Sequence, residues 1–197
     1  MVSVPGGIGL TGWLNDIYDE VIGGKNGMID GFRGIFRATG NVHVMVSEES
    51  KTYRPEMEWL IKQLGNRFSV CDSSFEDFSE GDSVYRFFEL FDLSNIAASN
   101  TLFNAARLKR IEITAPPKTY LEEKMLFALF WNRNLKEFWR RELGANYLRQ
   151  LEKVIPQTWI IDPSPLPPHA AIPGLNLTKW EQLSELSQKN RHLILKL

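Results

Sequence analysis

A strand-helix-strand pattern between residues 42 and 72 constrains the fold most strongly. The run VHVMV is apolar and rich in β-branched residues, as in a buried strand, and YRPEMEWLIKQLG follows it. In that second segment Pro55 suits a first helical turn and Gly65 ends the helix, after which RFSVCD is typical of another strand. This order predicts two parallel strands joined by a right-handed crossover.

Two more strands are predicted downstream. DSVYRFFELFDL has the composition of a third strand, and LKRIEITAPP of a fourth, which Pro116 and Pro117 terminate. We therefore predict an α/β fold with three layers and a mainly parallel, Rossmann-like sheet, in which Val44, Val84 and Ile113 lie in adjacent strands. A helical section is added after the fourth strand, and Gly144 splits it into two helices.

The remaining segments suggest a division of the chain. Residues 1–40 form an N-terminal helical extension, with Thr11 as a possible N-cap and Gly23-Gly24 as the end of its helix. Residues 41–162 form the α/β domain, which continues to a short strand in TWIID. Residues 163–176 contain five prolines and form an extended linker. Residues 177–197 are the start of a further domain.

The last residues, LILKL, have the composition of a strand that stops inside an apolar run. We therefore expect the chain to be a piece of a longer protein. A strand without its sheet neighbour leaves backbone groups unpaired, so residues Leu193 to Leu197 are expected to be poorly anchored or to pair with a second copy.

Composition excludes several classes of function. The net charge is -1, from 23 basic and 24 acidic residues, and gives no field that would hold nucleic acid or an anionic membrane. One cysteine and three scattered histidines form neither a disulfide framework nor a recognisable metal-binding spacing. We expect no signal peptide, and no apolar run reaches about 18 residues. A cytoplasmic protein fits these observations best.

Three segments resemble a known family in their order and spacing. SVYRFFELFDL, RIEITAPPKTYLEEKMLFALFW and LGANYLRQLEKVIPQTWIID resemble the region that precedes the ATP-binding part of circularly permuted ATP-grasp proteins, the glutathionylspermidine-synthase-like group. The resemblance covers roughly the last two thirds of the chain. It identifies LILKL with the strand whose lysine contacts ATP, so that Lys196 takes that role.

The resemblance implies ATP-dependent ligation of a carboxylate to an amine through an acyl-phosphate, with magnesium. This chain would then be the substrate-side N-terminal domain, inactive alone and without a cofactor of its own. Its partners would be the missing C-terminal ATP-grasp domain and a small carboxylate or peptide substrate. The competing hypothesis is a non-catalytic α/β module that binds a partner protein.

Arg86 and Lys124 are the candidate substrate ligands. Arg86 lies in an apolar strand, where a guanidinium requires an anionic partner. That partner is either a substrate carboxylate, held through two parallel hydrogen bonds, or a structural carboxylate from Glu89 or Asp92. Lys124 matches the family motif, although with Glu122 and Glu123 it also fits a solvated helix start.

Other conspicuous residues are predicted to be structural. The aromatic cluster of Phe87, Phe88, Phe91, Phe127, Phe130, Trp131, Phe138 and Trp139 has no basic patch beside it and is expected to be core. His43, His169 and Cys71 have no partner at a useful spacing. GGIGLTG follows no strand and carries no lysine-serine pair, so we assign no nucleotide site to it.

Overall fold

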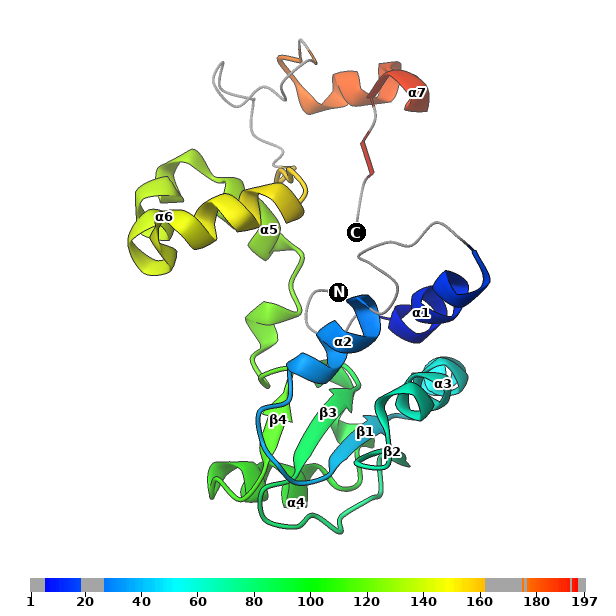
Figure 1. The fold of residues 1–197 in the computed structure, drawn as a ribbon. Helices are drawn as coiled ribbons and strands as arrows, with labels where there is room; N and C mark the ends of the chain where they lie inside the picture. The colour runs from blue at the N-terminus through cyan, green and yellow to red at the C-terminus, as the bar shows by residue number, and fades with distance from the viewer. Residues whose placement is uncertain (1–5, 19–26, 162–174, 176, 192, 195–197) are drawn as a thin grey trace. The chain divides into compact units, whose positions relative to one another are not determined.

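The computed structural model describes residues 6–18, 27–161, 175, 177–191 and 193–194. The chain divides into two compact units, Met1–Lys124 and Met125–Leu197. The first unit contains the N-terminal helices together with the sheet, and the second contains the helical section (Figure 1). The observed boundary therefore falls inside the predicted 41–162 range.

The sheet of the first unit has four parallel strands in the order β2-β1-β3-β4. This confirms the predicted α/β class and the adjacency of the strands that contain Val44, Val84 and Ile113. β3 is shorter than predicted, because the chain turns into a 3-10 helix over Leu90–Asn95. The strands are β1 (Val42–Val46), β2 (Phe68–Asp72), β3 (Ser83–Phe87) and β4 (Glu112–Thr114).

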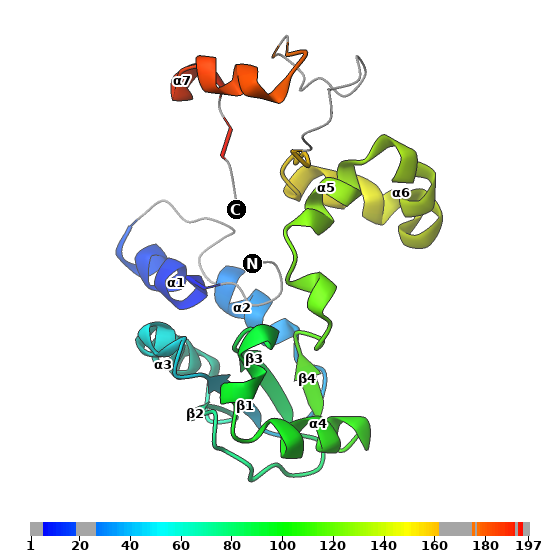
Figure 2. The same ribbon diagram turned by 180° about the vertical axis from the view of Figure 1, so that it is seen from behind.

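Helices cover both faces of the sheet and complete three layers (Figures 1 and 2). α3 (Arg54–Leu64) connects β1 to β2, as predicted, and α4 (Ser99–Arg107), which the sequence analysis missed, connects β3 to β4. The two apolar cores lie on opposite faces because alternate residues of a strand point in opposite directions. One core contains Val44, Leu60 and Tyr85, and the other contains Met45, Val84 and Leu102.

The N-terminal helices pack on the α3 side of the sheet. α2 (Gly27–Gly34) places Phe32 edge-to-face against Tyr85, with their ring centroids 4.9 Å apart. α1 (Ile8–Ile17) begins after Gly7, so the predicted N-cap Thr11 lies inside the helix and that prediction is wrong.

α1 packs through its smallest residues instead of its apolar stripe. Gly9 and Gly12 are buried, whereas Leu10, Trp13 and Ile17 are 50%, 44% and 55% exposed. A Cβ on Gly9 would lie 2.2 Å from the Glu56 carbonyl oxygen, so α1 approaches the backbone of α3 more closely than any side chain would allow. Gly9 and Gly12 of GGIGLTG therefore serve the packing of α1 on α3.

The N-terminus of α1 faces the carboxylate of Glu56 from α3. Glu56 accepts hydrogen bonds from the Gly7 N–H at 2.8 Å and from the Leu10 N–H at 3.4 Å. A carboxylate in this position satisfies free backbone donors and complements the positive end of the helix dipole.

The second unit contains α5 (Met125–Trp131), α6 (Lys136–Val154), a 3-10 helix (Trp180–Glu185) and α7 (Gln188–Arg191). Gly144, with φ 73° and ψ 156°, interrupts α6, which confirms the predicted split. The predicted strand in TWIID is wrong, because residues 157–161 have no regular structure. The start of this segment is held by Trp131, whose Nε1 donates to the Pro156 carbonyl at 2.8 Å.

Other predictions for the end of the chain fall mainly outside the described residues. This holds for residues 163–174 of the proline-rich segment, including His169, and for Lys196 with its neighbours Leu195 and Leu197. Leu193 and Ile194 are described and do not lie in a strand.

The aromatic residues follow the core prediction in part. Phe87, Phe88 and Phe130 are buried, and Phe130 contacts both Trp131 and Trp139 within the second unit. Phe91, however, is 80% exposed, because β3 ends before it and the 3-10 helix turns its ring outward.

Candidate functional site

Arg86 lies at the carboxyl end of β3 and is completely buried. Its Nε donates to the Ala115 carbonyl at 2.9 Å and its Nη2 to the Pro116 carbonyl at 3.3 Å. Its Nη1 donates to the Phe88 carbonyl at 2.9 Å and to Glu122 Oε1 at 2.5 Å. Each nitrogen of the guanidinium thus donates to a protein acceptor, which is the arrangement of a structural arginine; a substrate carboxylate bound to Arg86 stays a prediction.

Glu122 provides the charge that balances Arg86. Its side chain is 11% exposed, and its second oxygen accepts the Leu90 N–H at 3.0 Å. The expectation that Glu122 to Lys124 open a helix is wrong, since α5 begins at Met125 and Glu122 follows a short 3-10 helix (Thr119–Leu121). One carboxylate therefore ties the end of β3 to the segment after β4.

Further carboxylates lie near this end of the sheet. Burial raises the pKa of Glu89, and the nearby Glu122 raises it further, although Arg86 acts in the opposite direction. The pKa of Asp92 is also raised, by burial first and then by Glu49 and Glu122. Negative charge of this kind attracts a cationic group, such as an amine, more than a second carboxylate.

Lys124, the other predicted substrate ligand, is exposed at the last position of the first unit. Its role in substrate binding stays a prediction. The predicted ATP contact of Lys196 also stays a prediction, because that residue lies outside the described part of the chain.

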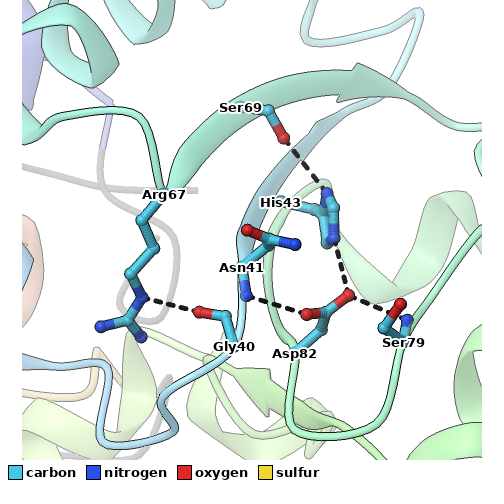
Figure 3. A network of polar contacts seen from close by, with 7 residues as sticks. All are labelled: Gly40, Asn41, His43, Arg67, Ser69, Ser79 and Asp82. Carbon is cyan, nitrogen blue, oxygen red and sulfur yellow. Dashed lines mark hydrogen bonds and ion pairs between the residues drawn. The ribbon is translucent and has the colours of Figure 1, made fainter.

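A second polar site lies at the opposite, amino end of the strands (Figure 3). His43 in β1 places Nε2 3.1 Å from Asp82 Oδ2 and Nδ1 3.1 Å from Ser69 Oγ in β2. The imidazole packs against the rings of Phe75 and Phe78, at centroid distances of 4.7 and 6.1 Å. His43 and Asp82 are buried, whereas Ser69 is exposed.

Asp82 is the anchor of this site. Its carboxylate accepts the Asn41 N–H at 2.8 Å and the Ser79 N–H at 2.9 Å, in addition to the contact with His43. Burial acts to raise the pKa of Asp82, but the hydrogen bonds from Ser79, His43 and Asn41 outweigh it and hold the pKa below its usual range. Asp82 is therefore a carboxylate at neutral pH.

Arg67 fixes the loop that leads into β1, next to this site. Its Nε donates to the Gly40 carbonyl at 2.7 Å (Figure 3). Its Nη2 donates to the Ala38 carbonyl. Gly40 itself lies against the turn before β3, where an added Cβ would come 2.4 Å from the Gly81 carbonyl oxygen. The backbone around Asn41 and Asp82 is thus held from both sides.

No local sequence pattern connects His43 with Ser69 or Asp82. His43 was expected to lack a partner, but Ser69 and Asp82, 26 and 39 residues away, both contact it. The predicted parallel sheet could have indicated these contacts, because the amino ends of parallel strands all lie at the same end of the sheet.

Neither site has the composition of a metal centre. Among the described residues, no group of three or more His, Cys, Asp and Glu side chains could hold a metal ion. Cys71 is a poor thiolate, because burial and the nearby Asp72 raise its pKa to about 12. No described helix has the length and apolar character needed to cross a membrane.

Comparisons of the chain with protein-family models, with curated proteins and with solved structures give no match.

Proposed function

We propose that this chain is the substrate-side domain of an ATP-dependent carboxylate–amine ligase of the ATP-grasp type. The observation that supports it is the ion pair between Arg86 and Glu122. Arg86 belongs to SVYRFFELFDL and Glu122 to RIEITAPPKTYLEEKMLFALFW, two of the segments on which the family resemblance rests. Two motifs far apart in sequence therefore form one structural unit, which gives a physical reason for both to be present.

In this proposal the chemistry takes place beside this domain. ATP bound with magnesium to an ATP-grasp domain would phosphorylate the substrate carboxylate, and the amine would then displace phosphate. Lys196 would contact ATP, and the protein would work in the cytoplasm. Lys124, at the end of the first unit, would reach the substrate, while Arg86 would hold the segment that positions Lys124.

Calorimetric titration of the purified chain tests the proposal. Magnesium-ATP alone should give no measurable heat, because the sequence carries no glycine-rich phosphate loop. Small carboxylic acids, peptides and amines should include at least one ligand that binds. Lys124→Ala should weaken that binding, whereas Lys62→Ala, which removes an exposed lysine from α3, should not.

Two results would contradict the proposal. The first is magnesium-dependent ATP binding in the micromolar range by this chain. The second is that no acid, peptide or amine binds to the chain. Equal affinity of the Lys124→Ala and Lys62→Ala variants for a ligand that does bind would also contradict it.

The second candidate is a non-catalytic module that binds a partner protein. The exposed apolar residues of α1 favour it, since Leu10, Trp13 and Ile17 lie at helical spacing on its outer side. Absence of any small-molecule ligand, together with proteolytic or crosslinking protection of α1 by a second protein, would favour the module over the ligase.

A further inference from the structure

The contacts of Ser69, His43 and Asp82 define the hydrogen positions in the network of Figure 3. Asp82 is a carboxylate and can only accept hydrogen bonds, so Nε2 of His43 carries the hydrogen in their 3.1 Å contact. In the neutral imidazole, Nδ1 then has a free lone pair. Because Ser69 Oγ lies 3.1 Å from Nδ1, the serine hydroxyl is the donor and the imidazole is its acceptor.

This arrangement matches the requirements for an activated serine. A nucleophilic hydroxyl needs a base within hydrogen-bond reach and a third group that orients the base. His43 and Asp82 are buried and hydrogen-bonded, whereas Ser69 is exposed, so the serine is the accessible residue of the three. The imidazole nitrogen that faces the serine is Nδ1, whereas serine proteases use Nε2, but the order of contacts is the same.

The position of Ser69 on an edge strand supplies a neighbouring hydrogen-bond donor. β2 is the outer strand of the described sheet, paired on one side with β1. The Val42 N–H donates to the Arg67 carbonyl at 2.8 Å. In this parallel register the backbone of Ser69 faces β1, and the N–H of Val70 faces the free edge. An N–H directly after the nucleophile can stabilise negative charge that develops on a substrate oxygen.

We propose that Ser69 is a nucleophile that accepts acyl groups from activated esters. Oγ of Ser69 attacks the ester carbonyl carbon while its proton passes to Nδ1 of His43. The bond between the carbonyl carbon and the leaving oxygen breaks, and the leaving group takes the proton from Nδ1. Water then repeats the sequence on the acyl-serine, releases the carboxylic acid and restores the hydroxyl. Asp82 acts as a positioning residue, since it holds the imidazole and does not touch the substrate.

The chain contains a matched control for this reaction. Ser74 is exposed, and its Oγ donates to Asp72 Oδ1 at 2.6 Å. Asp72 has a pKa below its usual range because Ser74 donates to it through both its side chain and its backbone N–H. Ser74 thus hydrogen-bonds to a carboxylate instead of an imidazole, and its reaction rate shows how an ordinary exposed serine reacts.

The test uses p-nitrophenyl acetate, with nitrophenolate release and peptide mass mapping as the two measurements. The folded chain should gain one acetyl group on the peptide that contains Ser69, about a hundredfold faster than on Ser74. Ser69→Ala should abolish the fast release, and Ser74→Ala should leave it unchanged. His43→Gln removes the general base, so it should slow nitrophenolate release about 10²–10⁴-fold, the usual contribution of general-base catalysis.

The acetylation rates of the folded and the unfolded wild-type chain can also be compared, which tests the proposal without any variant. In concentrated guanidinium chloride the two serines should react at equal, slow rates. The proposal is wrong if Ser69 in the folded chain is acetylated no faster than Ser74, or no faster than in the unfolded chain. It is also wrong if Ser69→Ala keeps the fast release.

Discussion

Arg86 and Glu122 are joined by a buried ion pair of 2.5 Å, although 36 residues separate them in the chain. The pair connects the carboxyl end of β3 to the segment after β4, and the carbonyls of Phe88, Ala115 and Pro116 also accept hydrogen bonds from the guanidinium. Breaking such a pair leaves one charge without its partner in a poorly solvated position.

We therefore predict that Arg86→Met lowers the free energy of unfolding by about 3–5 kcal/mol. Glu122→Gln should cost about 1–3 kcal/mol, since Arg86 keeps its carbonyl acceptors. Glu123→Gln, at an exposed neighbouring position, is the control and should have little effect. Urea denaturation measures all three. Unchanged stability of Arg86→Met with a loss of substrate affinity would assign Arg86 to substrate binding.

A second prediction concerns the contact between α1 and α3. Gly9→Ala would place a methyl group 2.2 Å from the Glu56 carbonyl oxygen, and relief of that overlap should cost about 1–3 kcal/mol. Gly31→Ala, within α2, is the matched control because nothing lies within 4 Å of its added Cβ. It should stabilise the chain by about 0.5–1 kcal/mol through helix propensity. Equal melting temperatures of the two variants would contradict the close packing of α1.

A third prediction concerns acid stability. The folded-state pKa of Asp82 is lowered, so its stabilising contribution is fully present above the unfolded-state pKa of about 3.9 and is lost as the pH falls through the folded-state value. Asp82→Asn should lower the free energy of unfolding at pH 7 by about 1–3 kcal/mol. The variant should also lose less stability than the wild type on acidification. Denaturation curves from neutral pH to acid measure this difference, and parallel pH profiles would refute it.

A fourth prediction uses two buried serines. Ser83 Oγ is buried without a hydrogen-bond partner among the described residues. Ser83→Ala should therefore raise the free energy of unfolding by about 1 kcal/mol. Ser47 is equally buried, but its Oγ accepts the Ser50 N–H at 3.3 Å, so Ser47→Ala should lower stability by about 0.5–1.5 kcal/mol. Thermal unfolding of both variants checks the sign, and destabilisation by both would contradict the assignment for Ser83.

The sequence was informative where apolar periodicity was strong. β1, α3, β2 and β3 follow the pattern that the residues predict, and so does the break of α6 at Gly144. α4 was missed because only Leu102 and Ala105 are buried in it, and its first turn is polar. α1 buries glycines, which carry no hydrophobic signal.

The candidate sites were harder to predict than the fold. A buried arginine in a strand indicates that an anionic partner exists, but not which of several carboxylates reaches it. Glu89 and Asp92 are near Arg86 in sequence, whereas the chain path after β4 brings Glu122 into contact. The partners of His43 likewise come from β2 and from the turn before β3. Such contacts depend on tertiary structure, and local pattern does not contain them.

The place of Asp82 in the chain has a consequence for the order of folding. β1 is made early but lies inside the sheet, with β2 on one side and β3 on the other. A growing chain that has reached Asp72 can pair β1 with β2 through α3, yet the Asn41 N–H and the His43 ring still lack their carboxylate. Asp82 arrives together with β3, so docking of that strand and completion of the polar site are one event. On the ribosome, the early β1-α3-β2 intermediate would therefore keep an open side until the chain has grown to the end of β3 at Phe87, and its lifetime would depend on the rate of translation through that short stretch.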